Sequence, residues 1–211
     1  MIIAVDGPAA SGKGTIARAL AAHYGLPHMD TGLLYRATAL NLLETGGDPQ
    51  SEFAAARATD IEQIDTDDPE LRSETVGSLA SRISAYPLVR AALLDRQRRF
   101  ATQAGGAVLD GRDIGTVIAP RAHAKLFVTA RPEVRAERRF AELRRQGRAV
   151  HLAEVLADIR VRDERDMGRG AAPLRRADDA VLLDTSDMTI EQSIAAAIAA
   201  VEARRAAIAK D

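Results

Sequence analysis

A glycine-rich turn near the N-terminus constrains this chain more than any other feature. It connects the apolar run Ile2–Val5, which predicts a buried strand, to Lys13–Tyr24, whose apolar residues recur at helical spacing. Glycines let successive backbone N–H groups in such a turn point inward, and the N-terminus of the helix that follows adds positive potential. Lys13 supplies a charge for the outer phosphates of a nucleoside triphosphate. The predicted triphosphate site consists of Gly7, Pro8, Ala9, Ala10, Ser11, Gly12, Lys13, Gly14 and Thr15.

An ordinary strand-to-helix turn is the alternative reading of this segment. Lysine is scarce in the chain, however, with three residues against 26 arginines, and chance alone rarely puts one of the three at this position. The strand before the turn and the helix after it also match the context that a phosphate-binding loop requires. We therefore expect a nucleoside triphosphate to bind here.

The rest of the chain alternates apolar strand-like runs with longer helical runs, which is typical of a parallel α/β sheet. We predict strands at Ile2–Val5, His28–Met29, Ala107–Leu109, Ala124–Thr129 and Ala180–Leu183. We predict helices at Lys13–Tyr24, from an N-cap at Thr31 to Thr45, and at Glu70–Ala85, Pro87–Ala104, Pro132–Gln146, Leu152–Met167 and Thr189–Lys210. Asp48–Asp68 is acidic and carries no strand pattern. The simplest organisation is one core (about 1–45, 105–130 and 170–211) with helical insertions at about 46–104 and 131–169.

Composition excludes several classes of protein. Apolar residues make up 46% of the 211 residues, which rules out a wholly disordered chain, and the net charge of −1 lacks the basic excess of a nucleic-acid coat. The chain has no cysteine, and its four histidines lack the close pairing of a metal site. No apolar run reaches the ~18 residues of a membrane span, and the N-terminal stretch lacks the basic region of a signal peptide. We expect a cytoplasmic enzyme with no nucleic-acid or membrane partner.

Two segments put polar residues where an acceptor substrate would bind. Asp30–Arg36 begins a predicted helix with a carboxylate and a hydroxyl, and its arginine follows one turn later. Asp110–Asp113 follows a buried strand, and ligands of open α/β sheets bind at the carboxyl ends of the strands. Asp110 stands where a carboxylate would order the water around a metal ion. A capped, solvated turn is the alternative in both cases, and it is weaker for Asp110–Asp113 because charge is concentrated directly at a strand end.

A third segment is rich in arginine. Arg162, Asp166 and Arg169 are spaced four and three residues apart, which predicts that all three share one face of a helix. Eleven arginines fall between Arg131 and Arg169. Arginines from a mobile segment neutralise the charge that spreads over a transferring phosphoryl group. A solvated helix with internal ion pairs is the alternative for this segment alone, but a lid over a triphosphate accounts better for so many arginines.

Taken together, these segments resemble the bacterial cytidylate kinases, which pass the γ-phosphoryl group of ATP to CMP or dCMP. The resemblance covers nearly the whole chain and includes Gly7–Thr15, Asp30–Arg36, Ser81–Arg90, Leu109–Thr116 and Arg162–Leu174. It implies a P-loop kinase fold with a five-stranded parallel sheet in the order 2-3-1-4-5, a helical CMP-binding insert and an arginine-rich lid. Gly14 stands where most P-loop proteins have a metal-binding hydroxyl. The resemblance therefore implies Mg²⁺ held by phosphates and water, with Asp110 in its outer shell.

The resemblance also implies a role for each candidate residue. Thr31, Arg36 and Arg112 would meet the monophosphate, Ser81, Arg90 and Asp113 the cytosine, and Arg162, Asp166 and Arg169 the sugar and phosphates. Lys13, Arg162 and Arg169 would be the catalytic residues of a direct transfer without a covalent enzyme intermediate. We expect a monomer. Thr31 stands where serine is common in the family, and Asp48–Asp68 is too short and too poor in β-formers to hold the small antiparallel sheet of longer members.

Two rival functions stay open at this point. A kinase for another small acceptor, such as UMP, AMP or shikimate, would share the phosphate loop but not the set of Ser81, Arg90 and Asp113. A non-catalytic P-loop switch would bind nucleotide without an acceptor pocket or a large number of lid arginines.

Overall fold

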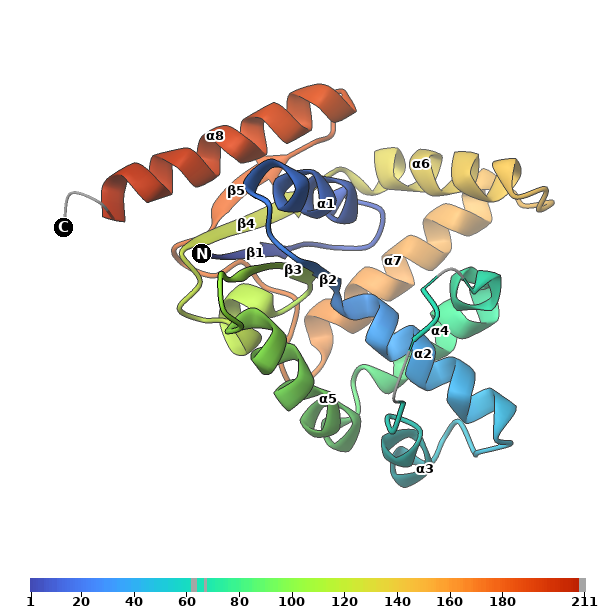
Figure 1. Cartoon of the computed structure of the whole chain (residues 1–211). Coiled ribbons are helices and arrows are strands. Elements are labelled where there is room, and N and C mark those ends of the chain that lie inside the picture. The colour runs from blue at the N-terminus through green and yellow to red at the C-terminus, as the bar shows by residue number, and fades with distance from the viewer. Residues whose placement is uncertain (62–63, 67, 209–211) are drawn as a thin grey trace. The chain divides into compact units, whose positions relative to one another are not determined.

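Five short segments form a single sheet, which Figure 1 shows beneath its covering helices. They are β1 (Ile2–Asp6), β2 (His28–Asp30), β3 (Ala107–Gly111), β4 (Ala124–Thr129) and β5 (Val181–Asp184). The strand order is β2-β3-β1-β4-β5, and β1 pairs in parallel with both β3 and β4. The predicted five strands and their order are confirmed. The central strands read as continuous apolar runs because both faces of the sheet are covered.

The computed structural model describes residues 1–61, 64–66 and 68–208, and the chain divides into two compact units. Met1–Met29 with Ala101–Asp211 is called the sheet unit below, and Asp30–Phe100 is called the helical unit. Within the described ranges, no helix is both long and apolar enough to cross a membrane.

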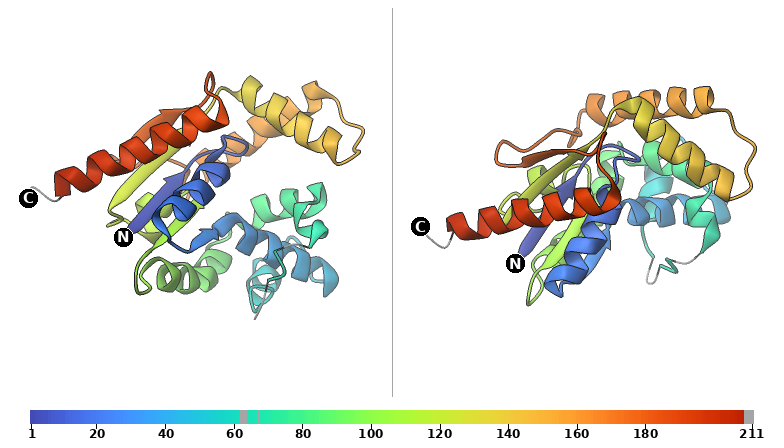
Figure 2. Two further views of the ribbon diagram at one scale, coloured as in Figure 1. Left: turned by 45° about the horizontal axis from the view of Figure 1, so that its top comes forward. Right: turned by 90° about the horizontal axis from the view of Figure 1, so that it is seen from above.

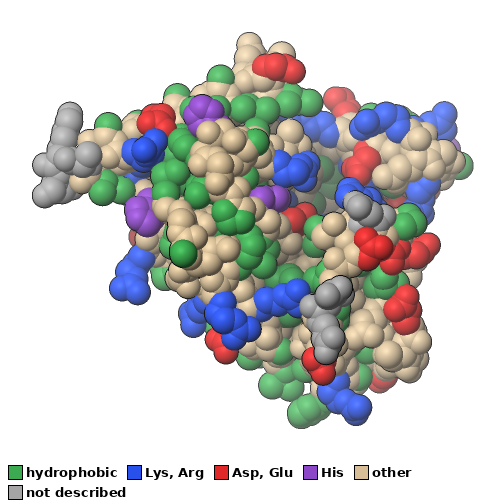
Figure 3. All heavy atoms as spheres, viewed as in Figure 1, with side chains coloured by type: hydrophobic (Ala, Val, Ile, Leu, Met, Phe, Trp, Pro, Cys, Tyr) green, Lys and Arg blue, Asp and Glu red, His purple; other side chains and the backbone are tan. Residues whose placement is uncertain are grey.

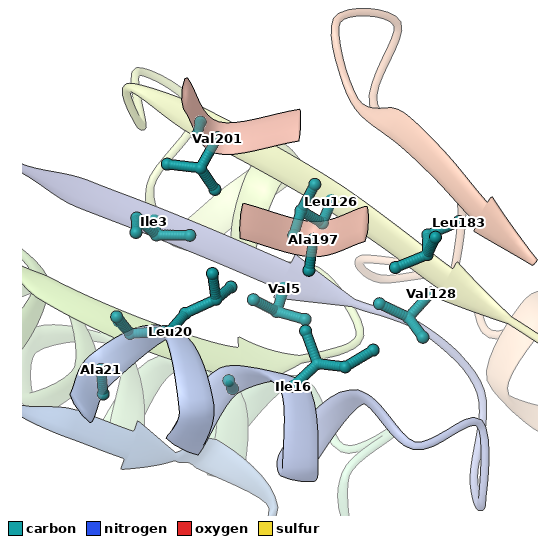
Figure 4. Packing of buried hydrophobic residues seen from close by; sticks show 13 residues of the cluster. Ile3, Val5, Ile16, Leu20, Ala21, Leu126, Val128, Leu183, Ala197 and Val201 are labelled. Carbon is teal, nitrogen blue, oxygen red and sulfur yellow. The ribbon is translucent and has the colours of Figure 1, made fainter. Parts of the chain in front are cut away.

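Two helices pack on one face of the sheet. α1 (Lys13–Tyr24) and α8 (Ile190–Ile208) contact each other, and α8 also contacts β4 and β5. Figure 4 shows the core between them, where Ile3 and Val5 of β1 meet Leu20 of α1 and Val201 of α8. The side chains of this cluster are almost completely buried, so the strand that leads into the phosphate loop is fixed within a closely packed apolar core.

A short π-helical turn, η2 (Ile114–Ile118), packs against β1 and β3. It buries Ile114 and Ile118 and follows directly after the polar residues that end β3. Such turns often occur at functional sites.

The arginine-rich segment forms a helical hairpin. α6 (Pro132–Arg145) and α7 (Leu152–Gly168) lie side by side in both views of Figure 2. Leu143 of α6 packs with Val155 and Ile159 of α7 in a small apolar core. The two helices of this hairpin therefore bury apolar residues against each other in addition to carrying many charges.

The helical unit contains α2 (Thr31–Glu44), α3 (Glu52–Arg57), the 3₁₀ turn η1 (Pro69–Arg72), α4 (Glu74–Ile83) and most of α5 (Pro87–Ala101). α2 packs against α3, η1 and α4. The predicted segment 48–68 partly lies outside the described residues, and the rest of it holds α3 and turns.

Two predictions about helix starts in this unit were wrong. Asp30, and not Thr31, is the N-cap of α2, because its carboxylate accepts a hydrogen bond from the backbone N–H of Gly32. The single helix predicted for 70–85 is broken at Ser73, which adopts an extended backbone and caps α4 through its hydroxyl. A side chain that satisfies a free N–H stabilises a new helix start.

Candidate active site

The phosphate loop lies between β1 and α1, and its backbone takes conformations that favour glycine. Gly12 precedes α1 in the left-handed region with φ of 89°, and Ala10 also has a positive φ of 58°. A Cβ atom on Gly7 would lie 2.0 Å from the carbonyl oxygen of Val128, so no other residue fits there. Lys13 is the first residue of α1. The sequence therefore forms the predicted tight turn, which leads into the N-terminus of a helix.

Arginines of α6 hold this loop from outside. Arg135 is 3% exposed and donates to the carbonyl oxygens of Ala130, at 2.8 Å, and Ala9, at 3.2 Å. Its guanidinium also forms a two-pronged ion pair with Asp163 of α7. The hydrogen bond to Ala9 joins the phosphate loop to α6, and the ion pair with Asp163 joins α6 to α7.

Arg138, one turn further along α6, acts in a similar way. It donates to the carbonyl oxygen of Thr185 at 2.6 Å and to its hydroxyl at 3.0 Å, and that hydroxyl donates to the carbonyl oxygen of Ser11 at 3.0 Å. Two of the eleven arginines that the sequence assigned to a triphosphate lid therefore have a structural partner in the loop or next to it. Figure 3 shows other Lys and Arg side chains on the surface over α6.

Asp6 ends β1 immediately before the loop, and its carboxyl group is buried. It accepts hydrogen bonds from the backbone N–H groups of Ile114, at 2.8 Å, and Gly115, at 2.7 Å. Burial raises the pKa of Asp6 to about 7, although these two N–H donors act in the opposite direction. Asp6 thus ties the start of the phosphate loop to the first residues of η2.

Asp110 lies on β3, is 1% exposed, and faces the loop with one oxygen. A Cβ atom on Gly14 would lie 3.8 Å from Oδ2 of Asp110. Oδ1 of the same carboxylate lies 2.8 Å from Nε2 of His28, which belongs to β2. Asp110 therefore lies beside the phosphate loop, as its predicted outer-shell role requires.

Arg112, Asp113, Asp166 and Arg169 come together next to the end of β3. Nε of Arg112 donates to Oδ2 of Asp166 at 2.7 Å, and the guanidinium of Arg169 lies 3.8 Å from Oδ1 of Asp113. Burial acts to raise the pKa of Asp166, but Arg112, Arg162 and Arg169 outweigh it, so the pKa is lowered overall. The cluster thus holds an ionised carboxylate among arginines that can also meet phosphate.

The predicted helix face of this cluster needs a correction. Arg162 and Asp166 lie on α7, but α7 ends at Gly168, and Arg169 follows it with an extended backbone. Arg169 is held there by a hydrogen bond from its Nε to the carbonyl oxygen of Ala172 at 2.8 Å. Its approach to Asp113 therefore depends on the chain leaving the helix and not on helical spacing.

The helical unit holds the other candidate residues. Arg36 donates to the carbonyl oxygen of Leu71 at 2.6 Å, and its guanidinium packs where a side chain on Gly77 would otherwise lie. Arg90 donates to the hydroxyl of Tyr35 and to the carbonyl oxygen of Ser84, both at 3.3 Å. Both arginines are therefore fixed by neighbours within the unit. Thr31 and Ser81 are buried, at the start of α2 and within α4.

The candidate residues thus fall into two groups. Thr31, Arg36, Ser81 and Arg90 belong to the helical unit, and Lys13, Arg112, Asp113, Arg162, Asp166 and Arg169 belong to the sheet unit.

Sequence reasoning missed three residues of the sheet unit that organise the site. Asp6 carried a signal, because a carboxylate at the end of an apolar strand and directly before a glycine loop needs a partner. His28 and Arg135 carried none, since their partners Asp110 and Asp163 are set by strand pairing and helix packing.

Known proteins resemble this chain along nearly its full length. A sequence model of the family described as cytidylate kinase matches residues 3–203. A protein named cytidylate kinase from Xanthobacter autotrophicus is 64% identical over 98% of this chain and 99% of its own length. Proteins of that name from Caulobacter sp. strain K31 and Methylocella silvestris are each 59% identical, over 97% and 96% of this chain and 95% and 94% of their own lengths.

A solved structure also supports the fold. The crystal structure of an uncharacterized protein from Eubacterium ventriosum has a TM-score of 0.55 to this chain at 16% sequence identity, and it covers 96% of this chain and 98% of its own. From the family match and these identities, we conclude that the chain belongs to the cytidylate kinase family.

Proposed function

We propose that this chain transfers the γ-phosphoryl group of ATP to CMP or dCMP and releases ADP with CDP or dCDP. The observation that carries the proposal is the cluster of Arg112, Asp113, Asp166 and Arg169, which lies in the same compact unit as the phosphate loop. A nucleotide switch has no use for such a cluster beside its triphosphate loop. Membership of the cytidylate kinase family supports the same reaction.

The donor half of the reaction uses the phosphate loop. Backbone N–H groups of Gly7–Thr15 and the ammonium of Lys13 would bind the outer phosphates of ATP and stabilise the charge that develops during transfer. Arg162 and Arg169 would add positive charge on the other side of the migrating group.

Mg²⁺ fits this site through Asp110. The Oδ2 atom of Asp110 faces Gly14, and a carboxylate at that place can accept hydrogen bonds from water bound to the metal. Magnesium keeps several waters and takes its other ligands from the phosphates of the nucleotide. When bound, it would neutralise charge on the β- and γ-phosphates.

The acceptor half would use the residues that the family resemblance implies. Thr31, Arg36 and Arg112 would bind the monophosphate, Ser81, Arg90 and Asp113 the cytosine, and Arg162, Asp166 and Arg169 the sugar and phosphates. The monophosphate is already an anion, so it can attack directly without a general base. Asp113 and Arg90 suit cytosine, because a carboxylate accepts from the N4 amino group and a guanidinium donates to N3 or O2.

A coupled assay with ATP and one acceptor at a time tests the proposal. CMP and dCMP should be phosphorylated far faster than UMP or AMP. Faster turnover of UMP, AMP or shikimate would assign the chain to another acceptor, and ATP binding without any transfer would make it a nucleotide switch. Lys13→Ala is the control for a contaminating kinase, and it should lose about 10²-fold or more in kcat while the protein stays folded.

The proposal includes the assembly and location of the enzyme. The enzyme would work as a monomer, since the proposed donor and acceptor residues all come from one chain. It would be located in the cytoplasm. Light scattering on the purified protein tests the first part, because a mass of twice 22.6 kDa would contradict it.

A further inference from the structure

His28 contacts the carboxylate that the proposed function puts beside the metal. Its Nε2 atom lies 2.8 Å from Oδ1 of Asp110, and both residues belong to the sheet unit. A carboxylate only accepts hydrogen bonds, so the ring nitrogen is the donor. The bond joins β2 to β3, which are neighbours in the sheet.

The contact determines which way the carboxylate of Asp110 points. Oδ1 is directed at His28, and Oδ2 is directed at Gly14 of the phosphate loop. Rotation of the carboxylate about its own axis would take Oδ1 out of reach of the ring. Because Asp110 is 1% exposed, little bulk water is present to replace that bond.

His28 is itself well placed to stay still. It lies on a strand, its side chain is 17% exposed, and the residue before it accepts a backbone hydrogen bond from Val108 of β3 at 2.9 Å. A partner held by the sheet positions a carboxylate better than one on a loop does.

We propose that His28 is a positioning residue for phosphoryl transfer, which fixes the carboxylate of Asp110 so that Oδ2 faces the phosphate loop and the Mg²⁺ that accompanies ATP. The reaction in this inference is the one given under the proposed function, but the test below measures only the binding of ATP and Mg²⁺ and does not depend on that function. His28 touches neither substrate nor metal. It acts through Asp110, in the way that outer partners orient the ligands of metal sites.

Two variants distinguish the effect of the hydrogen bond to Asp110 from the effect of the volume of the side chain at position 28. In His28→Gln the amide nitrogen takes roughly the place of Nε2 and keeps a donor, whereas His28→Leu keeps a similar volume without one. Calorimetry measures the Kd of ATP with saturating Mg²⁺ and again in EDTA. The ratio of the Kd of ATP in EDTA to its Kd with saturating Mg²⁺ should be about 10-fold smaller in His28→Leu than in the wild type. The Kd of ATP in EDTA should be the same in both proteins. His28→Gln should restore most of the loss.

The control is His123→Gln. His123 precedes β4 and accepts a hydrogen bond from the backbone N–H of Ile2 at 3.0 Å, so it tests the loss of a histidine that holds a strand but not Asp110. Its dependence on Mg²⁺ should match the wild type. If His28→Leu does not fold, His28→Asn replaces it, because the shorter amide cannot reach Asp110.

Three results would overturn the proposal. In the first, His28→Leu lowers the melting temperature but leaves the effect of Mg²⁺ on ATP binding intact, which would make His28 merely structural. In the second, His28→Gln behaves like His28→Leu. In the third, ATP binding by the wild type does not respond to Mg²⁺. Since the calorimetry contains no acceptor, a failure of the wild type to phosphorylate CMP would reject the proposed function separately.

Discussion

At the scale of single residues, two buried carboxyl groups have opposite pKa shifts although each is almost enclosed. Burial raises the pKa of Asp6 to about 7, because its close partners are two backbone N–H groups and Asp113 adds a charge of the same sign. Burial also acts on Asp166, but three arginines outweigh it and the pKa falls. The difference follows from the neighbours, since full charges of opposite sign stabilise an anion more than backbone dipoles do.

The raised pKa of Asp6 predicts a dependence of stability on pH. Between the ordinary value of 3.8 and about 7 the folded chain binds a proton at Asp6 that the unfolded chain has lost. The stabilisation is therefore complete at low pH and is lost as pH rises through about 7, with a slope of at most about 1.4 kcal/mol per pH unit. Urea unfolding from pH 5 to 8 measures this slope.

Asp6→Asn is the matched variant. It cannot ionise, so its free energy of unfolding should lack that part of the slope, although it should be less stable at low pH because the amide gives Gly115 no acceptor. Equal slopes in the two proteins would show that Asp6 is ionised throughout this range.

Asp113 is expected to decide between cytosine and uracil. The two bases differ mainly at position 4, where cytosine has an amino donor and uracil a carbonyl acceptor. A carboxylate that meets an acceptor stays desolvated without a partner, and the pairing with cytosine is worth about 1–3 kcal/mol. Asp113→Asn should therefore reduce the ratio of kcat/KM for CMP over UMP by about 10-fold or more, with little change in the KM for ATP.

Asp113 also lies near Arg169, so a loss of activity alone would not identify base reading. Asp163→Asn serves as the control, because it removes a carboxylate from an arginine pair that the proposed acceptor site does not include. Should the CMP to UMP ratio stay at its wild-type value in folded Asp113→Asn, another residue must read the base.

At the scale of elements, the bounds of helices were predicted best where residues at the helix ends carry a local signal in the sequence. α1 was predicted with both its bounds, because a glycine loop precedes it and Gly25 ends it with a left-handed backbone. The break at Ser73 was missed, since a serine within an apolar helical pattern signals a cap only when the chain before it turns away. The contacts of His28 and Arg135 depend on residues far away in sequence, and no local pattern records them.

The pair of Arg135 and Asp163 predicts how α6 and α7 hold together. Removing either side chain alone would leave the charge of the other buried without its partner. Arg135→Met or Asp163→Leu should therefore lower the free energy of unfolding by about 3–5 kcal/mol. Replacing both at once should cost clearly less than the sum, because two apolar side chains can pack where the ion pair was. Urea unfolding of the four proteins gives the coupling energy.

Arg160 and Glu133 provide the comparison, because they also connect α7 and α6 but are more than half exposed. A double-mutant cycle on that pair should give no more than about 1 kcal/mol. If the two cycles gave equal coupling energies, burial would not be what makes the Arg135 pair important.

At the scale of the whole molecule, the two units differ in how firmly their parts are packed. In residues 48–61, all of which are described, only Ala55 and Ala58 are buried. The α6–α7 hairpin buries Leu143, Val155 and Ile159. Segments with few buried apolar contacts open at low free-energy cost, so the acidic segment of the helical unit should exchange its amide hydrogens faster than the hairpin.

Ligand binding should change this exchange in a way that assigns each substrate. CMP is expected to slow exchange in the helical unit, including residues 48–61, and ATP with Mg²⁺ to slow it in the phosphate loop and residues 139–169. A ligand at about 100 times its Kd stabilises the bound state by about 2.7 kcal/mol, which limits the slowing to about 100-fold for amides that exchange only after the ligand has been released.

Four conditions distinguish the cases. Hydrogen exchange is measured without ligand, with each substrate alone, and with CMP plus ADP as a non-reacting pair. α8 is the internal control, because it contains none of the candidate substrate-binding residues. Identical exchange in residues 48–61 and 139–169 under all four conditions would contradict ligand-linked ordering of both segments, even if the assay had already shown transfer to CMP.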